Sequence, residues 1–282
     1  MNADSAFRMG STHAVCQDYA VAGAFAAAAQ SDGVGAPCRP YVILSDGCSS
    51  SPDTDTGARL LVKAAERLLR ESGGPHADGL AGLHAEAARL ALSWAGLLGL
   101  RPQAVDATLM TAHLDGGELV VGCSGDGVVC LQTADGALDA YVVSYPDGYP
   151  AYPAYAHQPA RMQTLADAGR ARKEVTRLRA ASAGERLRST QVSDGGGLTE
   201  VFVVKAADYR FAALLSDGVQ SFLDAGRAGL IPPESVLPEL VSFKNTRGAF
   251  AGRRMKGFLK DCRRKGWRHG DDLSLAALHL GG

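Results

Sequence analysis

Two copies of one short pattern constrain this chain more than any other feature of its sequence. Each copy, Leu44-Ser45-Asp46-Gly47 and Leu215-Ser216-Asp217-Gly218, ends a run of hydrophobic residues. A third acidic step, Gly270-Asp271-Asp272, precedes a hydrophobic run instead. A buried strand that ends or begins at an Asp places a carboxylate at the rim of its sheet. Several carboxylates at one rim repel one another unless a cation binds them, and such hard oxygen ligands suit Mg²⁺ or Mn²⁺.

The bulk composition indicates one folded domain. The chain has 282 residues, 46% of them hydrophobic and 21% charged, and no linker divides it. Its net charge of −1 gives no electrostatic reason to expect nucleic acid or a membrane surface as a partner. The N-terminus lacks the features of a signal peptide, and the apolar stretch 20–29 is too short to span a bilayer. We therefore expect a single-domain, soluble, cytoplasmic monomer over residues 1–282.

The cysteines are expected to be reduced thiols, most of them buried. No CxxC pair is present, so the spacing typical of a zinc site is absent, and a disulfide framework would be unusual at this length. The six residues are Cys16, Cys38, Cys48, Cys123, Cys130 and Cys262.

Hydrophobic periodicity predicts helices in the first half of the chain and then a series of strands. Helical spacing covers 57–70, with Thr54, Asp55 or Thr56 as N-cap, and 80–98. A turn-rich loop at 30–40 precedes a strand at 41–45. Short strands are expected at 107–114, 118–123, 128–133 and 138–143. Two Asp/Gly turns of the hairpin kind, Asp115-Gly116-Gly117 and Ser124-Gly125-Asp126-Gly127, separate the first three of these.

In the second half of the chain, the Tyr/Pro-rich residues 145–158 are expected to form an ordered loop. The basic stretch at 165–198 is expected to be part helix and part mobile excursion. Further elements are expected as strands at 201–205, 209–215 and 273–279 and as helices near 218–224, 233–243 and 248–265. This order favours an α+β class in which helices cover antiparallel sheets.

A series of motifs, in order, resembles the PPM (type 2C) family of metal-dependent protein phosphatases, in a divergent bacterial branch. The family fold is two antiparallel β-sheets sandwiched between layers of α-helices (α-β-β-α), which agrees with the predicted order, and a flap or insert would occupy about 145–198. The motifs are Gly10-x-x-His13-x-x-Cys16-Gln17-Asp18, Val42–Gly47 with Gly57-Ala58, Asp106-Ala107-Thr108-Leu109, Val120–Asp126, Phe211–Gly218 and Gly270–Ser274.

The resemblance implies a ligand set for two ions, Mn²⁺ or Mg²⁺. Asp46 would bridge both ions through its carboxylate, and Gly47 would offer its carbonyl oxygen to one of them. Asp217 and Asp271 would complete the ligands of the other ion. All of these are oxygen donors, as hard divalent cations require.

The resemblance also implies the reaction and its partners. Asp18 would hold metal-bound water, and Asp126 with Asp217 would support a third, weaker metal site. A hydroxide between the ions would attack the phosphorus of a phosphoserine or phosphothreonine in line, because two dications lower the pKa of water and neutralise phosphoryl charge. The partners implied are a phosphorylated protein substrate and a cognate Ser/Thr kinase.

Three positions depart from the family pattern. Gln17 stands where the family usually has Glu, and His13 stands where an Arg usually grips the substrate phosphate. Cys48 follows the first Asp-Gly, where some members have a His proposed as general acid. The departures leave the metal ligands in place. They motivate an alternative function, a pseudophosphatase or phosphoprotein-binding regulatory module with weak or no turnover.

Other interpretations stay open at individual residues. Asp46, Asp217 and Asp271 each also suit a turn or a helix N-cap at a strand end. Asp126 also suits a hairpin turn, and His13 also suits a satisfied polar position at a strand end.

Basic residues add further alternatives. Arg8 is a second candidate for an anion contact. The basic run in 170–188 lies where many family members carry a flap, so it could meet the substrate. The cluster between Arg253 and Arg268 is expected to be the solvated face of a helix, with a docking patch as the alternative. A hydrolase of small phosphoesters or nucleotides is a third function, disfavoured because no Gly-rich phosphate-cradling loop is present.

Overall fold

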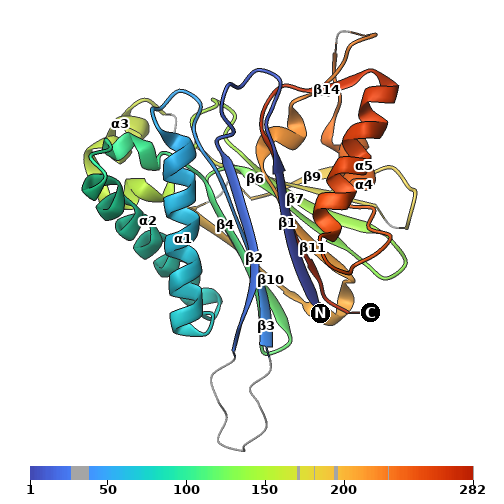
Figure 1. Cartoon of the computed structure of the whole chain (residues 1–282), viewed down its shortest axis with the longest axis horizontal. Coiled ribbons are helices and arrows are strands. Elements are labelled where there is room, and N and C mark those ends of the chain that lie inside the picture. Colours follow the sequence, from blue (N-terminus) through green and yellow to red (C-terminus); the bar gives the residue numbers. More distant parts are fainter. Residues whose placement is uncertain (27–37, 170–171, 181, 194–195, 228, 282) are drawn as a thin grey trace, which may run out of the picture.

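The computed structural model describes residues 1–26, 38–169, 172–180, 182–193, 196–227 and 229–281 (Figure 1). Most of the loop expected at 30–40 lies outside these residues, as do Arg170, which belongs to the basic run, and Asp194-Gly195. Within the described part of the chain, no helix combines the length and the apolar character needed to cross a bilayer.

Two large antiparallel sheets form the centre of the fold. The first has seven strands in the spatial order β1 (Asn2–Arg8), β15 (Leu273–His279), β11 (Phe211–Leu215), β6 (Gly127–Gln132), β7 (Leu138–Ser144), β8 (Glu174–Arg179) and β9 (Arg188–Ser193). The second has five strands in the order β10 (Thr199–Lys205), β5 (Glu118–Ser124), β4 (Leu109–Asp115), β3 (Cys38–Asp46) and β2 (Asp18–Ala26). A small third sheet contains β13 (Gly229–Leu230), β12 (Phe222–Asp224) and β14 (Trp267–His269).

Helices cover the outer faces of both large sheets (Figure 1). α1 (Thr54–Ser72) packs on β2 and β3, and α2 (Leu80–Leu97) packs beside it, whereas α5 (Phe250–Lys265) packs on β1 and β15 with α4 (Pro233–Leu240) next to it. α3 (Pro159–Asp167) lies at the α2 side. Short 3-10 helices span Ala77–Gly79, Pro102–Val105, Pro153–His157, Ala206–Asp208 and Asp217–Gln220. The arrangement confirms the predicted α+β class and its α-β-β-α layering.

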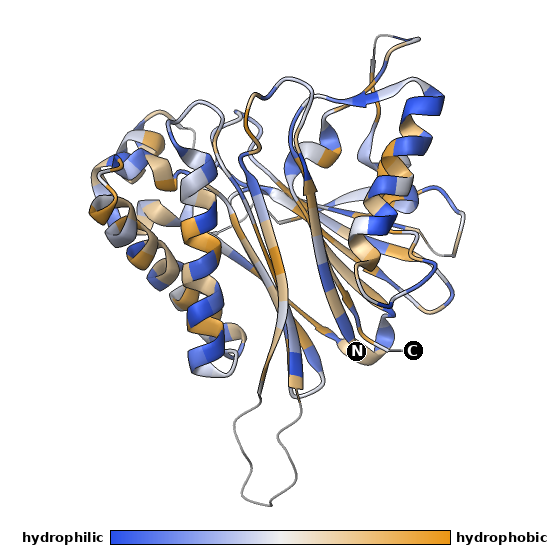
Figure 2. Cartoon of the chain, in the orientation of Figure 1, coloured by the Kyte–Doolittle hydropathy of each residue, from blue (hydrophilic) through white to orange (hydrophobic). Residues whose placement is uncertain are grey.

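Three layers of apolar side chains hold the sandwich together. One lies between the two sheets, one under α1 and α2, and one under α4 and α5. Hydrophobic and hydrophilic residues alternate along α1 and α5 in Figure 2, as expected for helices that bury one face. On α5 the buried residues are Phe250, Ala251, Met255, Phe258 and Cys262. Most of the basic side chains between Arg253 and Arg268 are exposed, which confirms the predicted solvated face.

The turn after β5 differs from the expected hairpin. β5 pairs with β4 and β10 in the five-stranded sheet, whereas β6 pairs with β7 and β11 in the seven-stranded sheet. Ser124-Gly125-Asp126-Gly127 therefore carries the chain from one sheet to the other. Gly125 and Gly127 adopt φ values of 87° and 148°, conformations that favour glycine. An Asp/Gly pattern predicts a tight turn but does not say which strands the turn joins.

Three other expectations were wrong in detail. Of the described residues in the 165–198 region, only the first are helical, as the end of α3. The region then forms the β8–β9 hairpin, where the buried Val175 and Leu178 are three residues apart and the register shifts after Val175, so no regular alternation marks the strands in the sequence. The helix expected near 218–224 is a 3-10 turn followed by β12. The N-cap of α1 is Asp53, with φ 58° and no side-chain capping hydrogen bond, and not Thr54, Asp55 or Thr56. Thr54 is the first residue of the helix, and its hydroxyl donates to the Cys48 carbonyl at 3.0 Å. The six cysteines are free, with three buried and Cys38 exposed.

Candidate active site

The acidic residues predicted from the sequence lie at strand ends of both sheets. Asp18 begins β2 and Asp46 ends β3, and the two residues are directly paired across these strands. Asp217 follows β11 and begins a 3-10 helix, and Asp271 precedes β15. Because β11 and β15 are neighbours in the seven-stranded sheet, their acidic ends come together at one rim.

Four carboxylates line one cavity of about 230 Å³. They belong to Asp46, Asp126, Asp217 and Asp271, and Gly47 lines the same cavity. The remaining lining residues are Cys48, Ser49, Ser50, Thr108, Gly148, Pro150 and Tyr152. Among the residues that the structure describes, no Lys, Arg or His lines this cavity. We call it the acidic cavity.

Asp18 is the strand partner of Asp46 but does not line the acidic cavity. Its side chain is 1% exposed, and its Oδ2 accepts a hydrogen bond from the Ser216 hydroxyl at 2.8 Å. The other oxygen, Oδ1, is buried without a partner, and so is Oδ1 of Asp217. Buried carboxylate oxygens without donors are costly, and a cation satisfies them.

Burial and mutual repulsion raise the pKa values of these carboxyl groups. Burial raises the pKa of Asp18 to about 7. Burial and the charge of Asp217 raise the pKa of Asp126 to about 7. Burial and the charges of Asp18 and Asp217 hold the pKa of Asp46 well above its usual range. Burial and Asp217 also raise the pKa of Asp271. Such crowding strongly disfavours full ionisation unless positive charge enters the site.

The donor chemistry of the site fits hard divalent cations, since every candidate ligand is an oxygen and two of the carboxylate oxygens are buried without partners. The side chains are not already arranged as a cage. Across the described ranges, no group of three or more His, Cys, Asp or Glu residues is placed so as to hold a metal ion as it stands. Asp46 and Asp217 instead lie within hydrogen-bonding reach of each other.

The glycine of each repeated Asp-Gly pattern is required by close approach of the backbone. A Cβ on Gly47 would lie 2.7 Å from the carbonyl oxygen of Thr54. A Cβ on Gly218 would lie 1.7 Å from the carbonyl oxygen of Asp272. Both distances are shorter than any real carbon contact, so only glycine lets these loops close around the acids.

The serine of each repeated pattern is a supporting residue that the sequence analysis did not single out. Ser45 donates to the carbonyl of Thr108 at 2.6 Å, and Ser216, besides binding Asp18, accepts from the Ser274 amide at 2.9 Å. Thr108 in turn accepts from the Asp46 amide at 2.9 Å. The repetition of Ser before both Asp residues was the available signal.

His13, in the loop between β1 and β2, does not line the acidic cavity but contacts Asp271, which does. Its Nδ1 is 3.0 Å from Asp272 and its Nε2 is 3.3 Å from Asp271. Although burial opposes the charged form, the hydrogen bond to Asp272 and the nearby acidic charges raise the pKa of His13. Asp272 also accepts from the amides of Gly10 at 2.7 Å and Gln17 at 2.6 Å, so it anchors the whole loop.

The other two departures from the family pattern are held by local hydrogen bonds. The side-chain amide of Gln17 donates to the Thr54 hydroxyl at 2.7 Å. Cys48 lines the acidic cavity, with its Sγ 3.1 Å from the Ser50 hydroxyl. Although burial works in the opposite direction, hydrogen bonds from Ser50 and Tyr152 lower the pKa of Cys48.

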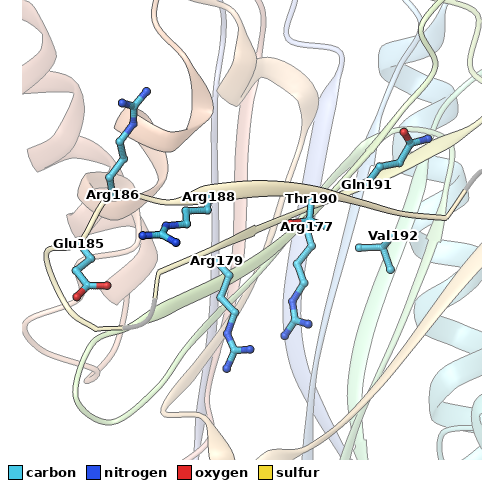
Figure 3. Close-up of a pocket in the computed structure, with 8 residues that line it drawn as sticks. All are labelled: Arg177, Arg179, Glu185, Arg186, Arg188, Thr190, Gln191 and Val192. Carbon is cyan, nitrogen blue, oxygen red and sulfur yellow. The ribbon is translucent and has the colours of Figure 1, made fainter.

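The basic run lies elsewhere. Arg177 and Arg179 on β8 and Arg188 on β9 line a separate open cavity of about 1030 Å³ (Figure 3). In the strand register, Arg179 lies opposite Asp139 on β7 and opposite Arg188 on β9. The other end of the β7–β8 pair is formed by Ser144 and Glu174. None of these arginines lines the acidic cavity. Arg8 is exposed and donates to the Phe7 carbonyl at 2.7 Å.

Comparisons with known proteins agree with this architecture. A family model described as protein phosphatase 2C matches residues 10–259. No match was found among curated proteins.

Several solved structures are similar in fold over nearly the whole chain. A bacterial serine phosphatase variant has a TM-score of 0.59 at 10% identity, covering 100% of this chain and 99% of that chain. A Staphylococcus aureus serine/threonine phosphatase has a TM-score of 0.56 at 11% identity, covering 100% and 96%. The catalytic domain of a serine threonine protein phosphatase in complex with two manganese ions has a TM-score of 0.50 at 17% identity, covering 98% and 97%. At these identities the likeness establishes the fold.

Proposed function

The chain belongs to the protein phosphatase 2C family, and on that premise we propose that it is a metal-dependent phosphatase acting on phosphoserine and phosphothreonine in proteins. One observation carries the proposal. Carboxylates from four separate segments, Asp46, Asp126, Asp217 and Asp271, line a single cavity at the rim of the sandwich. A cavity lined by acids, with no described cation beside them, suits a cation-dependent site better than a direct anion-binding site.

The residues expected to hold two ions, Mn²⁺ or Mg²⁺, are Asp46, Gly47, Asp217 and Asp271. Asp18 would hold metal-bound water, and Asp126 with Asp217 would contribute to a third, weaker site. Divalent cations in such a site lower the pKa of water and offset charge on the phosphoryl oxygens. A manganese complex of a structure with this fold supports the choice of ion.

The chain's own residues would position the acids and orient the phosphate. Ser216 fixes Asp18, and Thr108 fixes the backbone of Asp46. The hydroxyl-bearing Ser49 and Ser50 line the acidic cavity and can donate to phosphoryl oxygens. His13, held between Asp271 and Asp272, would act on the phosphate only after leaving those partners.

We further propose a single domain over residues 1–282 with a flap within 145–198, a monomer, and a cytoplasmic location. The substrate would be a phosphoprotein made by an opposing Ser/Thr kinase.

Hydrolysis of p-nitrophenyl phosphate and of phosphopeptides, with and without Mn²⁺, tests the proposal. Turnover should require the cation and should fall at least about 100-fold in Asp46→Asn, because removal of a direct ligand costs more than loss of an outer-shell partner. Asp208→Asn is the matched control, since Asp208 is exposed and outside the acidic cavity. Turnover that is equal in all three proteins, or independent of the cation, would refute the proposal.

A pseudophosphatase is the second candidate. It is favoured by the absence of a described basic side chain along the acidic cavity and by the engagement of His13 with two acids. Phosphopeptide binding in the presence of Mn²⁺ without turnover would select this alternative over the enzyme.

A further inference from the structure

A second cavity, of about 340 Å³, adjoins the acidic cavity. The two share part of their walls, because Cys48, Ser50, Gly148, Pro150 and Tyr152 line both. We call the second one the tyrosine cavity. Its far side is formed by residues around and within α3, including Arg161, Thr164 and Leu165. A molecule bound in one cavity can therefore contact the same residues as a molecule bound in the other.

The walls of the tyrosine cavity contain three planar groups packed against one another, Tyr152, Tyr155 and Arg161. The rings of Tyr152 and Tyr155 meet edge to face with centroids 5.6 Å apart, and both side chains are buried. The Arg161 guanidinium lies over the Tyr155 ring at 4.4 Å from its centroid. Guanidinium planes stack on aromatic rings, and two stacked planes offer a flat surface to a third.

Asp106 is the positioning residue for this surface. Its carboxylate, 1% exposed, accepts a two-pronged pair of hydrogen bonds from Arg161 at 2.6 and 2.8 Å. Ser51 donates to the same carboxylate at 2.8 Å, and Arg161 also donates to the Tyr155 hydroxyl at 3.0 Å. The fork fixes the guanidinium plane and also compensates its charge, while a third of the Arg161 side chain remains exposed.

We propose that the tyrosine cavity binds an aromatic side chain of the phosphoprotein substrate, from a residue within three positions of the phosphorylated Ser or Thr. The proposal rests on the proposed function and names the substrate feature that the site would select. Three extended residues span about 10 Å, enough to reach past Cys48 and Tyr152 from one cavity into the other. An aromatic ring would stack on the exposed guanidinium and contact Tyr152 and Leu165.

The charge of the cavity excludes the other classes of side chain. Because Arg161 is paired with Asp106 through both of its terminal nitrogens, it has little free positive charge for an acidic side chain. Because both oxygens of Asp106 already accept hydrogen bonds, its carboxylate has little free capacity to bind a basic side chain of the substrate. Among the described residues, the remaining surface carries no charge: it combines aromatic and apolar groups with the hydroxyls of Ser50, Ser51 and Thr164. The volume lies at the low end for ligand sites, as suits one ring.

The test uses a set of phosphoserine peptides that are Ala at every position around the phosphoserine except one. Phe, Asp or Arg is placed singly at each of the three positions on either side. In wild type, Phe should raise kcat/KM at least about ten-fold over Ala at one position, and Asp and Arg should not. The readout is the kcat/KM of the Phe peptide divided by that of the Ala peptide, so changes in overall activity cancel.

Two variants on α3 form a matched pair. Thr164 lines the tyrosine cavity, so Thr164→Phe would fill it and bring the ratio to within about two-fold of one. Gln163 is exposed and does not line the cavity, so Gln163→Phe adds the same ring to the same helix and should keep the wild-type ratio. A flat Phe profile in wild type, an equal ratio in the two variants, or a stronger preference for Asp or Arg would overturn the proposal.

A binding measurement separates this proposal from the proposed function. Fluorescence anisotropy with labelled peptides that carry a nonhydrolysable phosphonate, at saturating Mn²⁺, gives the same Phe-to-Ala ratio without turnover. If no phosphopeptide is hydrolysed, the proposed function fails. The tyrosine cavity then stands only if Phe still binds at least about ten-fold more tightly than Ala in wild type and in Gln163→Phe but not in Thr164→Phe.

Discussion

The stability of the cation-free protein should fall as the pH rises, and Asp18 should be a main cause. Asp18 is 1% exposed, and burial raises its pKa from 3.8 to about 7. The folded protein therefore keeps a proton on this group that the unfolded chain releases above about pH 4. The stabilisation is complete below the unfolded pKa and is lost as the pH rises through the folded one, so the free energy of unfolding decreases between about pH 4 and pH 7.

The size of the effect follows from the difference between the two pKa values. One pH unit corresponds to about 1.4 kcal/mol, so a shift from 3.8 to about 7 gives roughly 4 kcal/mol as an upper value. Asp18 interacts with its strand partner Asp46, so part of the titration belongs to the pair and not to Asp18 alone. We expect Asp18 to contribute a decrease of about 2–4 kcal/mol across this range, to which the raised pKa values of Asp46, Asp126 and Asp271 add.

Urea denaturation in EDTA at a series of pH values measures this decrease. Asp18→Asn removes the titrating group while its amide oxygen can still accept from Ser216, so the decrease should be smaller in the variant by about 2–4 kcal/mol. The variant should also be more stable than wild type above about pH 7. Asp208→Asn, an exposed control, should follow wild type. Saturating Mn²⁺ should remove most of the decrease, because cations bind the ionised native carboxylates. A wild-type profile that is flat or rises with pH, or one that Asp18→Asn leaves unchanged, would refute the reasoning.

Three further perturbations test the supports of the two cavities. Ser216→Ala should lower the free energy of unfolding in urea by about 1–3 kcal/mol, because it leaves buried groups without partners. Arg161→Ala should lower the free energy of unfolding by about 2–4 kcal/mol, because it leaves the buried carboxylate of Asp106 without its charged partner. The double variant with Arg161→Met and Asp106→Leu, which replaces both charges by apolar side chains, should recover most of this loss in the same assay. Gly218→Ala, whose Cβ would lie 1.7 Å from a backbone carbonyl, should weaken Mn²⁺ binding at least about ten-fold by calorimetry, whereas Gly252→Ala, with nothing nearer than 3.9 Å, should not.

The sequence predicted where the acids lie because strand ends are among the positions that hydrophobic runs define best. Asp46 and Asp217 end such runs and Asp271 precedes one, so their placement at a sheet rim follows from local pattern alone. Their grouping at one rim does not follow locally, since it depends on which strands are neighbours. The motif order of the family supplied that information. The role of each acid in binding cations stays a prediction.

Other parts of the site depend on pairings that no local pattern carries. Asp126 lies in an Asp/Gly turn that looks like a hairpin but joins two sheets, and this crossing places its carboxylate in the acidic cavity. The tyrosine cavity depends on Asp106 meeting Arg161 across a long stretch of chain. The sequence predicted an ordered loop at 145–158, but nothing in its spacing indicated that Tyr152 would line both cavities.

The three departures from the family pattern fall on a different kind of structure from the acids. His13 and Gln17 belong to a loop that Asp272 anchors through backbone amides, and Cys48 lies in the loop after β3. The candidate cation ligands lie at the ends of strands or in turns packed against them, where the two sheets fix their backbone. Substitution in the loops would therefore change the surroundings of a bound phosphate while leaving the candidate cation ligands in place. Cation binding and turnover would then be separable properties of the chain. Asp271 contacts His13 and also lines the acidic cavity, so it is the residue through which cation binding and turnover would be coupled.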